Sequence, residues 1–332
     1  MKIRVRDRLG SEDTNNVLVL GGIFVLFFAV MSILSPDTFL SVATMRSMCV
    51  QVPEFGIYAF AMMLAMISGG IDLSIVSVGN LASIIACRQM IAMASQSYSD
   101  GAAVAVGMVT AVAVGCVCGV INGVSISAIG IPPMLATLAT MQVFNGVSMV
   151  LTEGASVQGL PEAFSYIGSK SAFDVIPYTM LLFLAIAVVI GLVQSRTGLG
   201  LRMYLIGSNP KAAGYSGINN TLTTVIVYAM SGALAAVAGM ILSSRSMSAR
   251  MDYGSIYQLQ AILAVVLGGI SPSGGKGKTV GVLLAVLSLQ VLSTGLNILN
   301  LSDTSYLKNL VWGLLLLIVL VAKYYLSVRK TK

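Results

Sequence analysis

The segment Ser271 to Gly281, with the sequence SPSGGKGKTVG, places a lysine and a threonine behind several glycines, which is the composition of a phosphate-binding loop. In the pattern G-x-x-x-x-G-K-[ST], glycines let backbone N–H groups face the phosphates while the lysine reaches them. The first glycine of that pattern would have to stand at position 272, which holds a proline with no N–H to donate. The segment therefore does not predict an ATP site.

Two carboxylates, Glu54 and Asp72, are the only acidic residues expected at membrane depth, because the other ten of the twelve Asp and Glu residues lie in expected loops or tails. A charge inside a membrane is costly and usually serves a function. Ion-coupled transporters generally need such carboxylates or unwound carbonyl sites, and proton relays often use histidine, which the sequence lacks. If the chain transports a solute, we expect its energy to come from outside the chain.

Residues for catalysis or metal binding are scarce. An enzyme would need a histidine, paired carboxylates or a nucleophile with its base, and no such constellation is visible, so we predict no catalytic residue. The four cysteines, Cys49, Cys87, Cys116 and Cys118, fall within or beside apolar segments. We expect them to be small buried hydrophobic residues, not metal ligands or a disulfide. We predict no cofactor or metal bound by this chain.

The composition identifies the solvent in which these residues must be placed. Hydrophobic residues make up 57% of the chain and charged residues 9%, with a mean hydropathy of +0.92. A soluble domain has about 25% charged residues. Apolar stretches of about 20 residues, enough to cross a hydrocarbon core of about 30 Å, recur along the whole chain. We predict an all-α polytopic membrane protein whose single transmembrane domain covers residues 17–326, and the net charge of +7 reflects its topology, not nucleic-acid binding.

Ten spans are expected, and two of them look irregular. The eighth is too short to cross alone, and the third is diluted by Ser74, Ser77, Asn80 and Ser83, so both could be broken or partly re-entrant helices. The first is a retained span, because no small-residue cleavage pattern follows it. The ranges are 17–34, 44–68, 75–93, 101–122, 133–151, 177–195, 220–242, 259–270, 280–300 and 308–326.

Basic residues predict the orientation. With ten spans, both termini share a side, and Lys and Arg lie about two to one on that side, which the positive-inside rule makes cytoplasmic. An odd number of spans would split the basic termini across the membrane. We therefore expect residues 1–16 and 327–332 to be cytoplasmic tails of a multi-pass protein in a bacterial cytoplasmic membrane.

The internal loop 196–219 is also expected on the cytoplasmic side. Asn209 is a fitting N-cap, Pro210 suits the first helical position, and Gly214 or Gly217 can end the helix. A helix of six or seven residues, about 10 Å long, is not stable alone in water. It needs a surface against which to dock, although an ordinary loop is the alternative.

Five segments follow one another along the chain: GGIDLS, GVINGV at 119–124, IPPMLATLATM at 131–141, GLGLRMYLIGSNPKAAGYSGI and AILAVVLGGISPSGGKGKTVG. Each motif alone is weak, whereas their order and spacing together are specific. They resemble the successive signatures of the ribose-type membrane permeases of ATP-binding cassette sugar importers, and the resemblance runs from about residue 20 to 325.

The resemblance implies a ten-helix permease that works as a dimer with a second permease subunit, either identical or a sister chain. An extracytoplasmic solute-binding protein would feed it, and cytoplasmic ATPase subunits would bind ATP and Mg²⁺ and drive it. The glycine-rich segment 268–277 would then be a tight turn between the eighth and ninth spans. The 207–217 segment would be the coupling helix that fits a cleft on the ATPase, through the small or capping residues Gly207, Asn209, Pro210, Ala212, Ala213 and Gly217.

A sugar path needs hydroxyl and amide groups that exchange hydrogen bonds with a neutral solute. Asp72 has two compatible interpretations, as the N-cap of the third span or as part of the path or its gate. For each candidate, a hydrogen bond that only joins two helices is the alternative. The candidates are Asp72, Ser74, Asn80, Asn122, Thr137, Asn145, Gln290 and Asn297.

Two departures from the family's pattern bear on the solute. Ile75-Val76-Ser77 follows GGIDLS, and Gln258 and Gln260 replace an acidic pair that family members often carry. The segment RSMSARMDYGS, with Arg245, Arg250 and Asp252, resembles the rhamnose and autoinducer-2 branch and could contact the solute or the binding protein, or be a solvated turn. We predict an import permease for a monosaccharide or related polyol-like solute. The alternative is an ion-coupled secondary transporter of a small polar solute.

Overall fold

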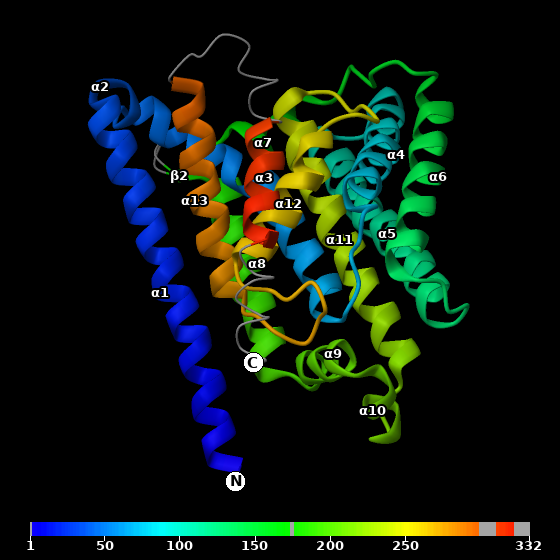
Figure 1. Cartoon of the computed structure of the whole chain (residues 1–332). Helices are drawn as coiled ribbons and strands as arrows, with labels where there is room; N and C mark the ends of the chain where they lie inside the picture. Colours follow the sequence, from blue (N-terminus) through cyan, green and yellow to red (C-terminus); the bar gives the residue numbers. More distant parts are fainter. Residues whose placement is uncertain (1, 173–175, 299–309, 322–332) are drawn as a thin grey trace.

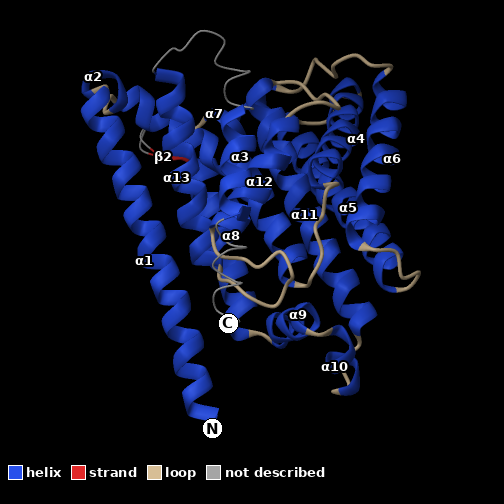
Figure 2. Cartoon of the chain, in the orientation of Figure 1, coloured by secondary structure: helices blue, strands red, loops and turns tan. Residues whose placement is uncertain are grey.

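The computed structural model describes residues 2–172, 176–298 and 310–321, with side chains described from residue 17 onward apart from Ala172. Figure 1 shows a bundle of long helices that run up and down side by side, and Figure 2 shows how little of it is strand. The helices are α1 Lys2–Leu34, α2 Pro36–Phe39, α3 Val42–Ile67, α4 Ile75–Ser95, α5 Asp100–Ser127, α6 Pro133–Thr152, α7 Glu162–Ser169, α8 Tyr178–Arg196, α9 Gly198–Ser208, α10 Pro210–Tyr215, α11 Asn220–Ser246, α12 Ser255–Leu267 and α13 Thr279–Ile298. The strands β1 Ser171–Ala172 and β2 Ile176–Pro177 pair antiparallel.

The expected all-α membrane architecture is confirmed. Eight described helices are long and apolar enough to cross a membrane, and the shorter apolar helices Ser255–Leu267 and Leu310–Val321 fall at the eighth and tenth predicted spans. The eighth is indeed short, with 13 residues in α12. The third, α4, is one continuous helix of 21 residues, in which Asn80 and Ser83 are hydrogen-bonded inside the bundle. Residues 299–309 and 322–332, which include parts of the ninth and tenth spans and the predicted C-terminal tail, lie outside the described residues.

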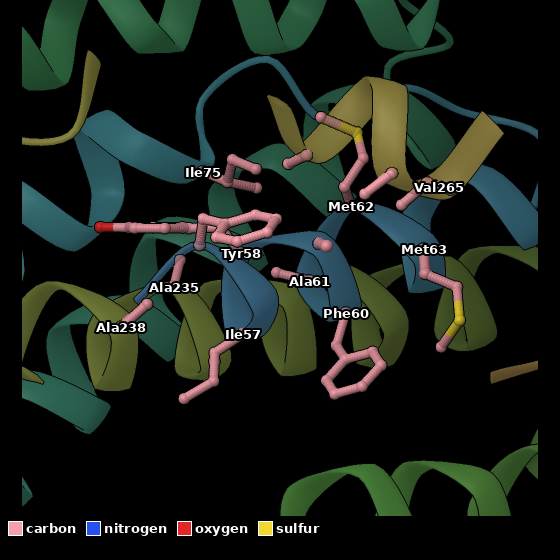
Figure 3. Packing of buried hydrophobic residues seen from close by; sticks show 14 of the residues in the cluster. Ile57, Tyr58, Phe60, Ala61, Met62, Met63, Ile75, Ala235, Ala238 and Val265 are labelled. Carbon is pink, nitrogen blue, oxygen red and sulfur yellow. The ribbon is translucent and has the colours of Figure 1, made fainter. Parts of the chain in front are cut away.

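Helix α3 forms the centre of the bundle and α1 lies at its edge. In the most apolar 18-residue window of each, 89% of the residues are buried in α3, against 6% in α1, which packs along α13. Figure 3 shows Phe60, Met62 and Met63 of α3 pointing in different directions into the core. A helix that is apolar all round can be covered on every side only in the interior of a bundle.

The closest helix crossing joins α5 to α11 through small residues. Gly115 and Gly119 of α5, four residues apart, face Gly232 and the backbone of Tyr228 in α11. A Cβ atom on Gly119 would lie 2.1 Å from the Tyr228 carbonyl oxygen, so only glycine allows this approach. Small residues at this spacing let helix backbones touch inside a membrane, where packing replaces the hydrophobic effect.

The N-terminal segment, predicted as a cytoplasmic tail, is helical. Residues 2–16 continue into the first span as one helix, α1, and no proline interrupts the chain between Lys2 and Leu34. The start of α1 lies on the same side of the bundle as α9 and α10 (Figure 1).

Candidate permeation and coupling sites

A buried polar network surrounds Asp72 in the non-helical connection between α3 and α4. The Asp72 Oδ1 atom accepts hydrogen bonds from the Ser74 N–H at 3.0 Å and the Ser74 hydroxyl at 2.7 Å, and Oδ2 accepts one from Ser231 of α11 at 3.0 Å. Asn122 of α5 donates to Ser74 at 2.7 Å and accepts from Thr140 of α6 at 2.6 Å. These contacts satisfy a carboxylate that is only 1% exposed.

The Thr137 hydroxyl of α6 contacts the backbone of the same connection between α3 and α4. Its hydroxyl oxygen accepts the Leu73 N–H at 3.1 Å and lies 3.0 Å from the Ile71 carbonyl oxygen. Four of the eight predicted path residues, Asp72, Ser74, Asn122 and Thr137, therefore lie in one cluster. Sequence reasoning missed Thr140 and Ser231, which complete it. Thr140 stands in the segment 131–141 but was not among the polar candidates, and no local pattern marks Ser231.

The expectation that Asp72 is the N-cap of the third span is wrong. Ser74 occupies the N-cap position of α4, and Asp72, two residues earlier, accepts its N–H and hydroxyl. An aspartate bonded to the backbone two residues on is a turn-forming arrangement, which fits a chain that must change direction here.

The other predicted path residues lie elsewhere. Asn80 of α4 donates to the carbonyl oxygens of Met251 at 2.8 Å and Tyr253 at 2.9 Å, so it holds the turn between α11 and α12. Gln290 of α13 donates to Gln51 of α3 and to Thr294, each at 3.1 Å. Asn145 is half-buried in α6, and Asn297 is exposed near the end of α13. The eight residues thus do not form one continuous lining.

Glu54, the second carboxylate expected at membrane depth, lies at the centre of another cluster. Arg245, in the last turn of α11, donates to Oε1 at 2.5 Å, and Tyr257 of α12 donates to Oε2 at 2.7 Å. Glu54 is 1% exposed, whereas the Arg245 side chain is 44% exposed. Phe55 and Tyr58 of α3 pack beside the Tyr257 ring. The cluster joins α3, α11 and α12 at one end of the bundle.

The segment from Arg245 to Ser255 is an anchored turn. Val157 and Ala249 exchange backbone hydrogen bonds, and the Ser248 and Tyr253 hydroxyls lie 2.7 Å apart. Arg250 and Asp252 form an exposed ion pair with 3.1 Å between Nε and Oδ1. Arg245 turns inward to Glu54, while Arg250 and Asp252 face outward, so the three charged residues of this segment have different surroundings.

The short helix α10 has the predicted caps. The Asn209 side chain accepts the Ala212 N–H at 3.0 Å, Pro210 is the first helical residue, and Gly217 has the positive φ of +81° expected after a helix end. The loop also holds a second helix, α9, which sequence reasoning missed. Thr197 is its N-cap and accepts the Gly200 N–H at 3.2 Å, and a threonine placed before G-L-G was not recognised as a helix start.

The surface of α10 differs from the one expected from small residues. Ala213 is only 3% exposed and Gly207 is buried at the end of α9, so both face the chain's own interior. Asn209, Pro210, Ala212 and Gly217 are exposed. Sequence reasoning missed Tyr215, whose side chain is 93% exposed at the end of α10. A large ring held out on a capped helix is the kind of group that fills a pocket on a partner.

The glycine-rich segment after α12 is a folded turn within the bundle. The Gly275 N–H donates to the Ile67 carbonyl oxygen at 2.9 Å, and the Tyr204 hydroxyl donates to the Gly277 carbonyl oxygen at 2.5 Å. Positive φ angles at Gly269, Gly274, Gly275 and Gly277 explain its composition. In a phosphate loop such an N–H group would face the nucleotide, but here the Gly275 N–H binds the end of α3.

Comparison with known proteins now decides the family. A family model described as the permease component of branched-chain amino acid transport systems matches residues 44–320. The chain belongs to this permease family. It is 36% identical over 298 residues to the ribose import permease of Bacillus subtilis strain 168, which covers 90% of this chain and 89% of that protein.

Two further relatives in this permease family are named for different solutes, ribose and autoinducer 2. Identity to the ribose import permease of Haemophilus influenzae is 32% over 310 residues, or 92% of each chain. Identity to an autoinducer 2 import system permease of Yersinia enterocolitica is 31% over 274 residues, or 81% of this chain and 80% of that protein. The ribose-type resemblance seen in the motifs is thereby confirmed, and these relatives are permease subunits, which are transport components.

Proposed function

We propose that this permease is the membrane subunit of an ATP-driven importer for a monosaccharide or a related small polyol-like solute. The observation that carries the proposal is the 36% identity to a ribose import permease over nine-tenths of the chain. The capped helix α10 and the glycine-rich segment 268–278, whose Gly275 N–H binds Ile67, support a division of labour between this chain and separate ATPase subunits that bind ATP and Mg²⁺.

The partners follow from this role. An ATPase subunit would receive α10 in a cleft, with Tyr215 as the anchoring side chain and Asn209, Pro210, Ala212 and Gly217 around it. The N-terminus would be cytoplasmic, since the start of α1 lies on the side of α10 (Figure 1). The C-terminus would be cytoplasmic by the distribution of basic residues. An extracytoplasmic binding protein would then approach the opposite end, where Arg245, Arg250 and Asp252 lie.

A second permease subunit would complete the path. The eight polar candidates divide between the Asp72 cluster, the Asn80 and Gln290 contacts, and the less buried Asn145 and Asn297. A path between two chains would use exposed groups of each. The buried clusters would set the position of the helices that line it.

Ion-coupled transport by the chain alone is the second candidate, and the buried carboxylates of Asp72 and Glu54 favour it. Asp72 already accepts three hydrogen bonds from Ser74 and Ser231, and Glu54 accepts from Arg245 and Tyr257. Those contacts describe a structural anchor at least as well as an ion site, and the family supports the first candidate.

Reconstitution tests the proposal. Proteoliposomes that contain the permease, its ATPase and its binding protein should take up ribose or another solute from a panel of monosaccharides and autoinducer 2 only with internal ATP. Tyr215→Ala should lower copurification of the ATPase and uptake by about tenfold, in line with loss of an aromatic hot spot, whereas Tyr98→Ala on an exposed tyrosine after α4 should change neither. Uptake by this chain alone under a sodium or proton gradient would refute the proposal.

A further inference from the structure

Two helices of the bundle end in the same way. Helix α3 ends at Ile67 and α12 at Leu267, and each is followed by a glycine with positive φ, +91° at Gly69 and +93° at Gly269. The next N–H bonds back into the helix in both cases, from Gly70 to Ala65 at 3.0 Å and from Ile270 to Val265 at 3.2 Å. Non-helical segments, 68–74 and 268–278, then lead to α4 and α13.

These two non-helical segments meet each other at Gly207, near the end of α9. A Cβ atom on Gly207 would lie 2.0 Å from the Ile67 carbonyl oxygen and 2.5 Å from the Gly275 nitrogen, and one on Gly274 would lie 2.7 Å from the Gly69 Cα atom. Three stretches of backbone therefore touch without intervening side chains. We call Gly69, Gly207, Gly274 and Gly275 the glycine junction. Backbone packed this closely transmits displacement directly, because no flexible side chain can absorb it.

Helices α8 and α9 also hold the rest of the segment that joins α12 to α13. The Gln194 Oε1 atom, in the last turn of α8, accepts from the Thr279 N–H at 2.9 Å and hydroxyl at 2.7 Å, which caps the start of α13. The Tyr204 hydroxyl of α9 donates to the Gly277 carbonyl oxygen. Hydrogen bonds and backbone contacts thus clamp residues 274–279 onto the stretch 194–208.

Helix α10 is joined to this clamp without a linker. Asn209 is both the C-cap of α9, where its N–H donates to Leu205 at 3.0 Å, and the N-cap of α10, where its side chain accepts from Ala212. The buried Ala213 packs α10 onto the chain, and Figure 1 shows α9 next to the loop between α12 and α13, with α10 following α9. A displacement of α10 must therefore move α9.

We infer that Tyr204 and Gly207 are positioning residues for coupling, through which a displacement of α10 reaches the inner ends of α3 and α12 and the start of α13. The inference rests on the proposed function, because it takes α10 as the site of ATPase docking. It names the non-helical segments 68–74 and 268–278 as the parts of the path that open and close. Paired interruptions of helices at corresponding places are where transporters bind and gate their solutes.

Two variants and a matched control test this assignment in the reconstituted importer. Tyr204→Phe removes the hydroxyl that binds Gly277 and keeps the ring. Gly207→Ala places a methyl group against the Ile67 carbonyl oxygen. Gly198→Ala, in the first turn of the same helix, is the control, since its Cβ atom would meet nothing within 4 Å. The measurements are copurification of the ATPase, ATP hydrolysis stimulated by the binding protein, and solute taken up per ATP.

We expect both variants to bind the ATPase and to hydrolyse ATP, while solute taken up per ATP falls by about fivefold in Tyr204→Phe, the equivalent of one lost hydrogen bond, and further in Gly207→Ala. Gly198→Ala should match the wild type. An unchanged ratio in Tyr204→Phe overturns the inference, and so does a parallel fall in hydrolysis and uptake, which would mark a purely structural role. Failure of the wild-type chain to use ATP would refute the proposed function instead.

Discussion

The two ends of this permease are held together by different means. At the end that carries Arg245, side chains make the connections: Glu54 joins α3 to α11 and α12, and Asn80 joins α4 to the turn after α11. At the end that carries α10, the glycine junction brings backbones into direct contact. Side-chain contacts can be exchanged one at a time, whereas a backbone contact is lost as soon as any side chain is added. A substitution at the first end therefore costs the contacts of the side chain that is removed, whereas the glycine junction requires glycine.

The largest effect is expected at the glycine junction. Gly274→Ala combines a strained positive φ of +83° with a Cβ atom 2.7 Å from the Gly69 Cα atom. We expect a loss of about 4 kcal/mol in the free energy of unfolding, measured by thermal denaturation in detergent. Gly130→Ala is the control, because Gly130 also has a positive φ, of +87°, but open space around it, and it should lose about 1 kcal/mol. Equal losses would show that backbone strain, not contact, matters.

The next largest effect is expected at the ion pair of Arg245 and Glu54, where replacing either partner should cost a different amount of stability. Arg245→Gln leaves the Glu54 carboxylate, 1% exposed, without a counter-charge and should cost about 3 kcal/mol. Glu54→Gln should cost only about 1 kcal/mol, because the Arg245 side chain, 44% exposed, can be hydrated and the new amide oxygen still accepts from Tyr257. The same thermal assay on both variants measures this asymmetry. A larger loss for Glu54→Gln would contradict the description of this end.

A smaller effect is expected where one amide holds a turn. Asn80→Ala removes two hydrogen bonds to the carbonyl oxygens of Met251 and Tyr253 and should cost about 2 kcal/mol. Proteolysis of the 247–254 turn in detergent should become faster in that variant. Asn297→Ala, at an exposed position, serves as the control and should leave both stability and proteolysis unchanged.

The smallest effect is expected at the exposed ion pair. Arg250→Ala removes a contact between side chains that are 46% and 55% exposed, so the loss should be within about 0.5 kcal/mol. If uptake falls while the thermal midpoint is unchanged, Arg250 acts in contact with a partner or solute. A large loss of stability would mean that the exposed ion pair stabilises the end that carries Arg245 more than the buried contacts there do.

Most of the fold followed from the sequence. The apolar stretches predicted all the spans that the structure describes, and the caps at Asn209 and Pro210 predicted α10, because both signals are local. The burial of Ala213 and the exposure of Tyr215 were not predictable, since they depend on which face of α10 packs against the bundle. The α9 helix was missed because its threonine cap is a weak local signal.

The polar residues were predicted by type but not by arrangement. Asp72 and Glu54 were recognised because a charge in an apolar segment is unusual at any position. Their partners Ser231 and Tyr257 come from helices far away in the chain, and nothing local marks them. Gly207 was expected to face an ATPase and instead touches Ile67 and Gly275, which only the three-dimensional crossing of three segments determines.

The chain of hydrogen bonds through Asp72 bears on how well an idle permease seals its membrane. It runs from Ser231 through Asp72, Ser74 and Asn122 to Thr140, so these polar groups are already paired without water. A file of water through this layer would have to displace bonds already made, at a cost that ordinary thermal fluctuation rarely meets. Without such a file of water, an idle permease would not conduct protons, and the proton gradient across the membrane would be preserved.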